Sequence, residues 1–213
     1  LEGLEPPDTS DPEKNEFYDM IDAQLTTEIF GLFSPTKPEF AIEMSKLPIQ
    51  TTARKEAQEI AEFYVRMYSN ASNTKNLKSI KEKMIWLANE SRSNLNNDLY
   101  PSKMYDYVKG LYDSGIKWEQ TRDSIYYRYQ VNQKDEYNIT SKNLYCNGCY
   151  AAGINFASSL VSLFYGEGDL KETIKIGTLA GWDSDNPTST WGGLIGFIIG
   201  REMVEKEFNM QLS

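Results

Sequence analysis

The 213-residue sequence contains no histidine, only two cysteines and no run rich in lysine or arginine. Without an imidazole, any general base that this chain supplies is an aspartate or a glutamate. Nucleic-acid binding needs a basic surface that releases counterions from phosphates. The formal net charge of this chain is −9, so nucleic acid is excluded as an expected partner.

Long apolar runs are also missing. The most apolar run, Leu194 to Ile199, is much shorter than the roughly 20 residues that cross a bilayer. An anionic lipid surface would moreover repel an acidic chain. We therefore expect no membrane association. The acidic balance is compatible with cation binding, although a solvated acidic surface is the simpler explanation.

The two cysteines, Cys146 and Cys149, form an isolated C-x-x-C pattern. They are too few for a structural zinc site, which needs four ligands, and they lack the preceding strand of a thioredoxin-like redox motif. We interpret them as structural cysteines, free or paired in a disulfide. Glycosylation patterns of the form Asn-x-Ser/Thr occur at Asn70, Asn89 and Asn138, a number close to chance. Together these features slightly favour a secreted or extracellular protein over a cytoplasmic one.

Most of the chain has the apolar spacing of helices. Hydrophobic residues make up 40% and charged residues 25%, which is typical of a globular protein. Residues 1–15 are rich in proline and acidic residues and are predicted to be a loop or linker. No strand or hairpin pattern stands out, so we predict an all-α, multi-helix bundle. The expected helices cover about 21–33, a short segment from 38, 53–68, 77–88, 101–114, 118–129, 151–165, 170–180 and 188–208.

An acidic segment precedes the last predicted helix. Asp183 and Asp185 are separated by one residue, so a tight turn can direct both carboxylates toward one point. Hard cations such as magnesium prefer such oxygen ligands, and Asn186 adds a neutral oxygen. The alternative is an acidic cap over the positive end of the last helix.

Three glycines follow this segment at intervals of four residues. Gly192, Gly196 and Gly200 fall on one side of the predicted last helix. Glycine is unfavourable inside a helix unless a neighbouring backbone or a ligand approaches closely. We interpret the three glycines as a contact surface for close helix packing.

The segment that contains the acidic residues resembles the C-terminal signature of the ADP-ribosylglycohydrolase family. The resemblance rests on Leu-Phe-Tyr-Gly-Glu-Gly-Asp at 163–169, Ala-Gly-Trp-Asp-Ser-Asp-Asn at 180–186 and Gly-Gly-Leu-Ile-Gly at 192–196. The stretch from 21 to 38, with its two prolines, is similar to the central helix of that family and the loop after it. Residues 3–7 resemble the lead-in to this helix in longer members.

The resemblance implies a fold and a metal site. Members of the family are orthogonal multi-helix bundles with two magnesium ions in a cleft. By match to the motif, Asp183 and Asp185 would be metal ligands. Asn186 stands where the family's third ligand usually lies, and an amide oxygen binds a hard cation less strongly than a carboxylate does.

The family's other ligand set is a Thr-Asp-Asp run in the N-terminal half, and this sequence contains no Asp-Asp pair. The resemblance therefore implies that residues 16–213 form the C-terminal half of a single domain. The remaining ligands, and the rest of the two-magnesium site, would come from the N-terminal half of the same protein or from a processed partner chain. On this reading the chain by itself is inactive.

The implied activity is hydrolysis of the glycosidic bond between ADP-ribose and an acceptor such as a protein side chain. Asp22, Gln24 and Glu28 lie about one turn apart on a predicted helix, so they can share a face and are candidate ligand-binding residues. Trp182 can stack on the same ADP-ribose-like ligand. The alternatives are a polar interhelical face for the first three residues and core packing for Trp182. At the level of function, the alternatives are a catalytically retired structural or binding protein and a secreted hydrolase of a different nucleoside or glycoside.

Overall fold

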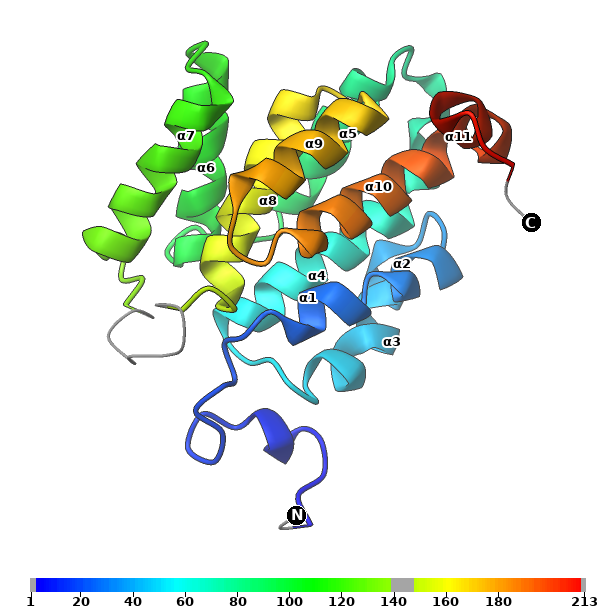
Figure 1. Ribbon diagram of the computed structural model, residues 1–213. Coiled ribbons are helices and arrows are strands. Elements are labelled where there is room, and N and C mark those ends of the chain that lie inside the picture. Colours follow the sequence, from blue (N-terminus) through cyan, green and yellow to red (C-terminus); the bar gives the residue numbers. More distant parts are fainter. Residues whose placement is uncertain (1–2, 139–147, 212–213) are drawn as a thin grey trace.

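The structure is a computed structural model that describes residues 3–138 and 148–211. Within these ranges the fold is all-helical, as predicted, and the only sheet-like feature is an isolated bridge between Met20 and Ala151. Figure 1 shows the helices packed at varied angles around a central pair, α4 and α8. The α-helices are α1 (Asp22–Thr26), α2 (Ile29–Phe33), α3 (Pro38–Ile49), α4 (Glu56–Asn70), α5 (Ile80–Arg92), α6 (Tyr100–Asp113), α7 (Trp118–Ile125), α8 (Ala152–Gly166), α9 (Leu170–Ala180), α10 (Asp185–Ile199) and α11 (Arg201–Phe208). Two short 3-10 helices, η1 (Asp8–Ser10) and η2 (Ala71–Asn76), and a π-helical segment, η3 (Tyr126–Val131), complete the fold.

Two side-chain caps and one proline fix where α5, α9 and α3 begin. Ser79 accepts a hydrogen bond from the backbone N–H of Glu82, and the Glu82 side chain accepts one from Ser79 in return, which satisfies two N–H groups at the start of α5. Asp169 caps α9 by accepting from the backbone N–H of Glu172 at 2.8 Å. Pro38 is the first residue of α3, the helical position at which the missing N–H of proline costs nothing.

Helix α8 is the centre of the core. Nearly every one of its residues is buried, as its all-round apolar sequence predicts. It contacts α4, α6, α9 and α10. Aromatic rings fill the space between these helices: Tyr64 lies 5.2 Å from Trp191 and Phe63 lies 5.1 Å from Phe156, measured between ring centroids. Such rings bury large apolar areas, so this cluster is a main source of the fold's stability.

The first predicted helix is interrupted. Residues 21–33 form two short helices that part at Thr27 and Glu28. The hydroxyl of Thr27 donates to the carbonyl of Ala23 at 2.6 Å, a bond that competes with regular helical geometry. The break lets α2 lie against α4 so closely that Gly31 has no room for a side chain beside Val65. Tertiary packing therefore overrides the helical period.

The last predicted helix differs at both ends. It begins at Asp185, earlier than the predicted start at 188, because Pro187 is only its third residue and is tolerated in the first turn. Gly200, with φ of 83°, ends α10 and separates it from α11. The prediction that Gly192, Gly196 and Gly200 form a surface for close helix packing is wrong. A Cβ on Gly192 or Gly196 would meet only ordinary van der Waals contacts at 3.6–3.7 Å. The close approach on α10 is at Gly193, where a Cβ would lie 2.9 Å from the Tyr68 hydroxyl.

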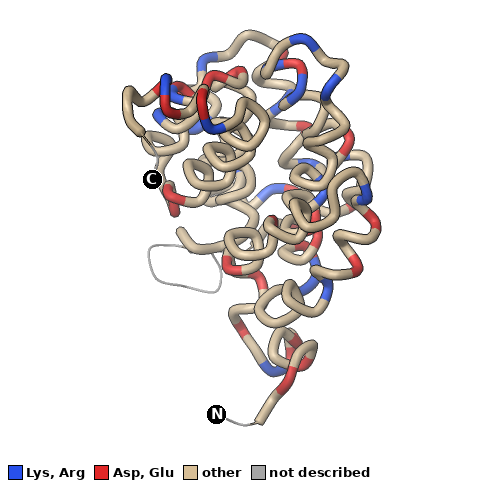
Figure 2. Tube along the Cα trace, turned by 90° about the vertical axis from the view of Figure 1, so that its right-hand side faces the viewer, with Lys and Arg blue, Asp and Glu red and all other residues tan. Residues whose placement is uncertain are grey.

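The N-terminal segment follows an irregular path except for η1 and is anchored to the bundle. Ser10 is fully buried, and its hydroxyl donates to the carbonyl of Gln50 at 2.6 Å. In the part of the chain that the structure describes, no helix is long and apolar enough to cross a membrane. Acidic and basic positions are interspersed over the surface (Figure 2).

The candidate modification positions lie in different settings. Asn70 is the last residue of α4 and is half-buried, whereas Asn89 on α5 is exposed and accepts a hydrogen bond from the Tyr105 hydroxyl at 2.9 Å. Asn138 is exposed at the end of the first described range. Cys149 is disulfide-bonded, and Cys146 lies outside the described residues.

Candidate functional site

The acidic turn, residues 181–185, comprises the connection between α9 and α10 and the first residue of α10. Gly181 and Trp182 both have left-handed backbone conformations, with φ of 97° and 56°. Glycine adopts this conformation freely, but it is unusual for a tryptophan. Two such residues in succession reverse the chain sharply, and the backbone N–H of Asn186 then donates to the carbonyl of Asp183 at 3.1 Å to close the turn. The carboxylates of Asp183 and Asp185 remain at the surface: Asp183 is half-buried and Asp185 is exposed.

A buried asparagine of α8 fixes the acidic turn. The Asn155 side-chain oxygen accepts a hydrogen bond from the backbone N–H of Asp183 at 3.1 Å. Its amide nitrogen donates to the carbonyls of Cys149 at 2.6 Å and Ala151 at 2.9 Å. One side chain, only 1% exposed, thus joins the turn to the segment before α8. Buried polar groups satisfied in this way specify a single local geometry.

Asp22 reaches the same place from the opposite end of the sequence. The backbone N–H of Ile21 donates to Tyr150 at 3.0 Å and that of Ala152 to Asp19 at 2.9 Å, so the start of α1 is tied to the segment before α8. A cavity of about 420 Å³ opens between these segments and the acidic turn, and Asp22 and Asp183 both line it. Its remaining walls are mostly apolar: Phe17, Met20, Ile21, Leu25, Gly148 and Tyr150.

The two carboxylates that line this cavity, Asp22 and Asp183, and the neighbouring Asp185 influence one another. The pKa of Asp183 is raised to about 6, first by burial, then by the hydrogen bond and the charge of Asp185, and last by the charge of Asp22. Like charges held this close favour a bound proton or a bound cation. No group of three or more Asp, Glu, His or Cys side chains within the described ranges is arranged to bind a metal. The described carboxylates therefore do not complete a metal centre.

Asn186 lies in a different environment from the two aspartates. It is fully buried, its side-chain oxygen accepts from the Thr190 hydroxyl at 3.4 Å, and its amide nitrogen has no hydrogen-bond partner. Because Asn186 is in the first turn of α10, its side chain points into the bundle while Asp185 is exposed. The third position of the motif is thus occupied by an interior amide.

The predicted group of Asp22, Gln24 and Glu28 is divided. Asp22 is exposed at the cavity, whereas Gln24 is 1% exposed and both polar atoms of its amide lack a partner. The expectation that all three share one face is therefore wrong, because residues two apart point to opposite sides of a helix and the helix breaks before Glu28.

Glu28 lies in a polar interior beside α4 and α10. One oxygen of its carboxyl, Oε2, is buried without a hydrogen-bond partner, and burial raises the pKa of Glu28 to about 7. The hydroxyl of Tyr68 donates to the carbonyl of Thr190 at 2.6 Å, while that of Tyr64 is hydrogen-bonded to Ser159 at 2.6 Å. The charge of Glu28 acts on both tyrosines. Glu28 therefore belongs to the bundle interior and does not line the cavity at Asp183.

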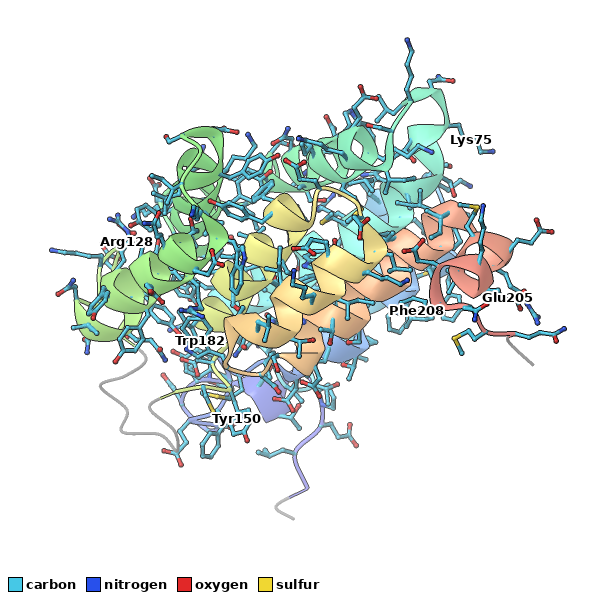
Figure 3. The ribbon with its side chains drawn as sticks, turned by 45° about the horizontal axis from the view of Figure 1, so that its top comes forward. Lys75, Arg128, Tyr150, Trp182, Glu205 and Phe208 are labelled. Carbon is cyan, nitrogen blue, oxygen red and sulfur yellow. The ribbon has the colours of Figure 1, made fainter. Side chains whose placement is uncertain are left out.

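Trp182 faces away from the Asp183 cavity. Its indole N–H donates to the side-chain oxygen of Gln130, on η3, at 2.7 Å. Figure 3 shows Trp182 and Tyr150 at separate positions around the acidic turn, with Trp182 toward the α7 side. A second cavity, of about 450 Å³, lies there and is lined by Arg122, Asp123, Tyr126, Leu179, Ala180, Gly181 and Trp182.

Two residues that position the site were not singled out from the sequence. The signal for Asn155 was present, since it is a lone amide in an otherwise apolar helical stretch. Gln130 lies just after the predicted sixth helix, 118–129, in the π-helical segment η3. Local π-helical geometry has no pattern that the apolar spacing reveals.

The fold and the site define an all-α protein with a buried central helix and an acidic turn at the mouth of a cavity. The family model described as ADP-ribosylglycohydrolase matches residues 3–212. The chain therefore belongs to the ADP-ribosylglycohydrolase family, which makes it a hydrolase-type protein for ADP-ribose linkages in general. Comparisons with the curated proteins and with the solved structures gave no match.

Proposed function

We propose that this protein is a magnesium-dependent hydrolase that cleaves the glycosidic bond between ADP-ribose and a protein side chain. The observation that supports it most is that Asp22 and Asp183 line one cavity, with Asp185 hydrogen-bonded to Asp183, in a chain that matches the family from residue 3 to residue 212. The side chains that a ligand meets there are carboxylates and apolar groups. This set suits a cation-assisted reaction on a sugar better than recognition of an anion.

The acidic turn offers some of the ligands that a magnesium ion needs. Asp183 and Asp185 offer the carboxylate oxygens that this ion prefers, on a turn that Asn155 holds in place. When bound, the ion would polarise a sugar oxygen and make a water molecule more acidic. Asp22 lines the same cavity as Asp183, so it would stabilise positive charge that develops on a ribose bound there, as carboxylates do in glycoside hydrolysis.

The remaining ligands are proposed to come from the N-terminal half of the same protein or from a separate chain. Large apolar side chains beside α1 support this proposal: Phe17, Ile29 and Phe33 are 49%, 44% and 64% exposed. Exposed apolar groups of this kind mark surfaces that another segment covers. Metal-dependent activity of the 213-residue chain without any added segment would contradict it.

The test is release of ADP-ribose from an ADP-ribosylated protein by the full-length enzyme, with and without magnesium. Asp183→Ala and Asp185→Ala are each expected to lower the rate by roughly 100-fold or more, because a metal ligand is lost. Asp98→Ala, at an exposed aspartate in the loop before α6, is the matched control and should leave the rate unchanged. A magnesium-independent rate, or full activity in both variants, would overturn the proposal.

A catalytically retired family member is the second candidate. The interior position of Asn186 favours it, since the third motif residue is turned away from the two aspartates. Under this alternative the folded, magnesium-loaded protein binds ADP-ribose but does not release it from any ADP-ribosylated substrate. The same assay therefore separates the two candidates.

A further inference from the structure

The acidic turn is anchored at two successive residues, and the two anchors come from different parts of the bundle. Asn155, on α8, accepts a hydrogen bond from the backbone N–H of Asp183. The preceding residue, Trp182, donates its indole N–H to the side-chain oxygen of Gln130 at 2.7 Å. Gln130 is only 6% exposed and belongs to η3, so the turn is tied to the α7–η3 segment as well as to the central helix.

The backbone at Trp182 sets the direction in which Asp183 points. Gly181 and Trp182 line one cavity, whereas Asp183 lines the other together with Asp22. This change of side occurs at Trp182, whose left-handed φ of 56° is unfavourable for a residue with a side chain. A strained conformation of this kind persists only where the surrounding structure enforces it. The interactions of the Trp182 side chain therefore bear directly on the position of the Asp183 carboxylate.

Packing alone does not fix the indole of Trp182. The residue is half-buried against the core, but it also borders a cavity of about 450 Å³ that Tyr126 and Leu179 line as well. A side chain beside open space can change its rotamer, whereas a hydrogen bond to a buried acceptor specifies one orientation. The acceptor, Gln130, lies in a π-helical segment, a rare geometry that often occurs at functional sites. Gln130 thus supplies the interaction that selects the orientation of Trp182.

We propose that Gln130 is a positioning residue for the acidic turn. Through the indole of Trp182 it keeps the backbone of that residue left-handed, and so keeps the carboxylate of Asp183 beside Asp185 and at the wall of its cavity. This role rests on the proposed function, in which Asp183 and Asp185 bind magnesium. Replacement of a residue that orients metal ligands without touching the metal typically lowers metal affinity or activity by about 10- to 100-fold.

The first test is the affinity of the full-length protein for magnesium, measured by calorimetry without substrate. Gln130→Leu removes the acceptor, and Trp182→Phe removes the donor but keeps an aromatic ring, so each should weaken magnesium binding by roughly 10- to 100-fold. The double variant should bind no more weakly than the worse single variant, because both changes remove the same hydrogen bond. Tyr165→Phe is the matched control. It removes a hydrogen bond of 2.7 Å to Thr121, between α8 and α7 but at the opposite end of α8 from Asn155, and magnesium affinity should stay within about twofold of the wild type.

The second test measures the turn itself, in the absence of magnesium. Hydrogen exchange reports whether the backbone N–H groups of Asp183 and Asn186 keep their bonds to Asn155 and to the Asp183 carbonyl. Both groups should exchange roughly tenfold faster or more in Gln130→Leu, and at the wild-type rate in the Tyr165→Phe control.

The two tests separate the positioning role from the proposed function. Faster exchange in Gln130→Leu, in a protein whose wild type binds no magnesium, would support the positioning role and count against the hydrolase. Magnesium affinity and exchange at wild-type levels in folded Gln130→Leu and Trp182→Phe would overturn the positioning role, even where the wild type hydrolyses its substrate with magnesium.

Discussion

Replacement of Asn155 tests whether a single buried amide holds the acidic turn. In Asn155→Ala, the backbone N–H of Asp183 and the carbonyl of Cys149 lose the partners they have at 3.1 Å and 2.6 Å. The carbonyl of Ala151 keeps a second donor, the backbone N–H of residue 155 at 3.4 Å. Each polar group left without a partner costs about 1–3 kcal/mol. Since both groups are only partly buried, we expect a loss of about 2–3 kcal/mol in the free energy of unfolding.

Urea denaturation followed by circular dichroism measures this loss. Ser158→Ala is the matched control, because Ser158 lies on the same helix, is 1% exposed and has a hydroxyl without a hydrogen-bond partner. Its removal should change the free energy of unfolding by less than about 1 kcal/mol. Asn155→Asp keeps the size of the side chain but loses the amide donor and, when ionised, buries a charge, so it should also destabilise the protein at neutral pH. An Asn155→Ala variant as stable as Ser158→Ala would refute the reasoning.

Two further predictions concern packing and pH. Gly31→Ala should destabilise the protein by about 1–3 kcal/mol in thermal melts, because its Cβ would overlap the Val65 carbonyl. Gly110→Ala, in open space on α6, should be neutral or stabilise it by up to about 1 kcal/mol, and equal effects of the two would contradict the packing argument. The pKa of Glu28 is raised to about 7 by burial, so the stability contributed by its protonated form should be lost as pH rises from about 4.5 to above 7. Urea titrations at several pH values measure the free energy of unfolding of the wild type and of Glu28→Gln. The wild type should lose roughly 3 kcal/mol relative to the variant over this pH range, and a constant difference between the two would contradict the prediction.

The sequence predicted the secondary structure better where local signals are strong. The helices predicted over 151–165 and 170–180 are confirmed as α8 and α9, with bounds that differ by no more than one residue. Errors occurred where packing overrides periodicity. The break at Thr27 and Glu28, the stop at Gly200 and the close contact at Gly193 each depend on a neighbouring element or on a backbone conformation that apolar spacing does not encode.

In the candidate site, too, the local features were predicted and the contacts between distant segments were not. The spacing of Asp183 and Asp185 in a short turn was evident from the residues, and the structure places both at the surface of that turn. The sequence grouped Asp22 with Gln24 and Glu28, but the structure groups it with the acidic turn. Trp182 was assigned to the same ligand as the aspartates, yet it lines a separate cavity.

By itself, the sequence determined the all-α class, most helix positions, the acidic turn and the family. These properties follow from local periodicity, capping residues and motif spacing, which act over a few residues along the chain. Only the tertiary structure decided that Asp22 meets Asp183, that Asn155 holds the turn and that Asn186 is buried. The physical reason is that an apolar stripe specifies which side of a helix is buried but not which partner covers it, and the two cavities arise where those partners meet.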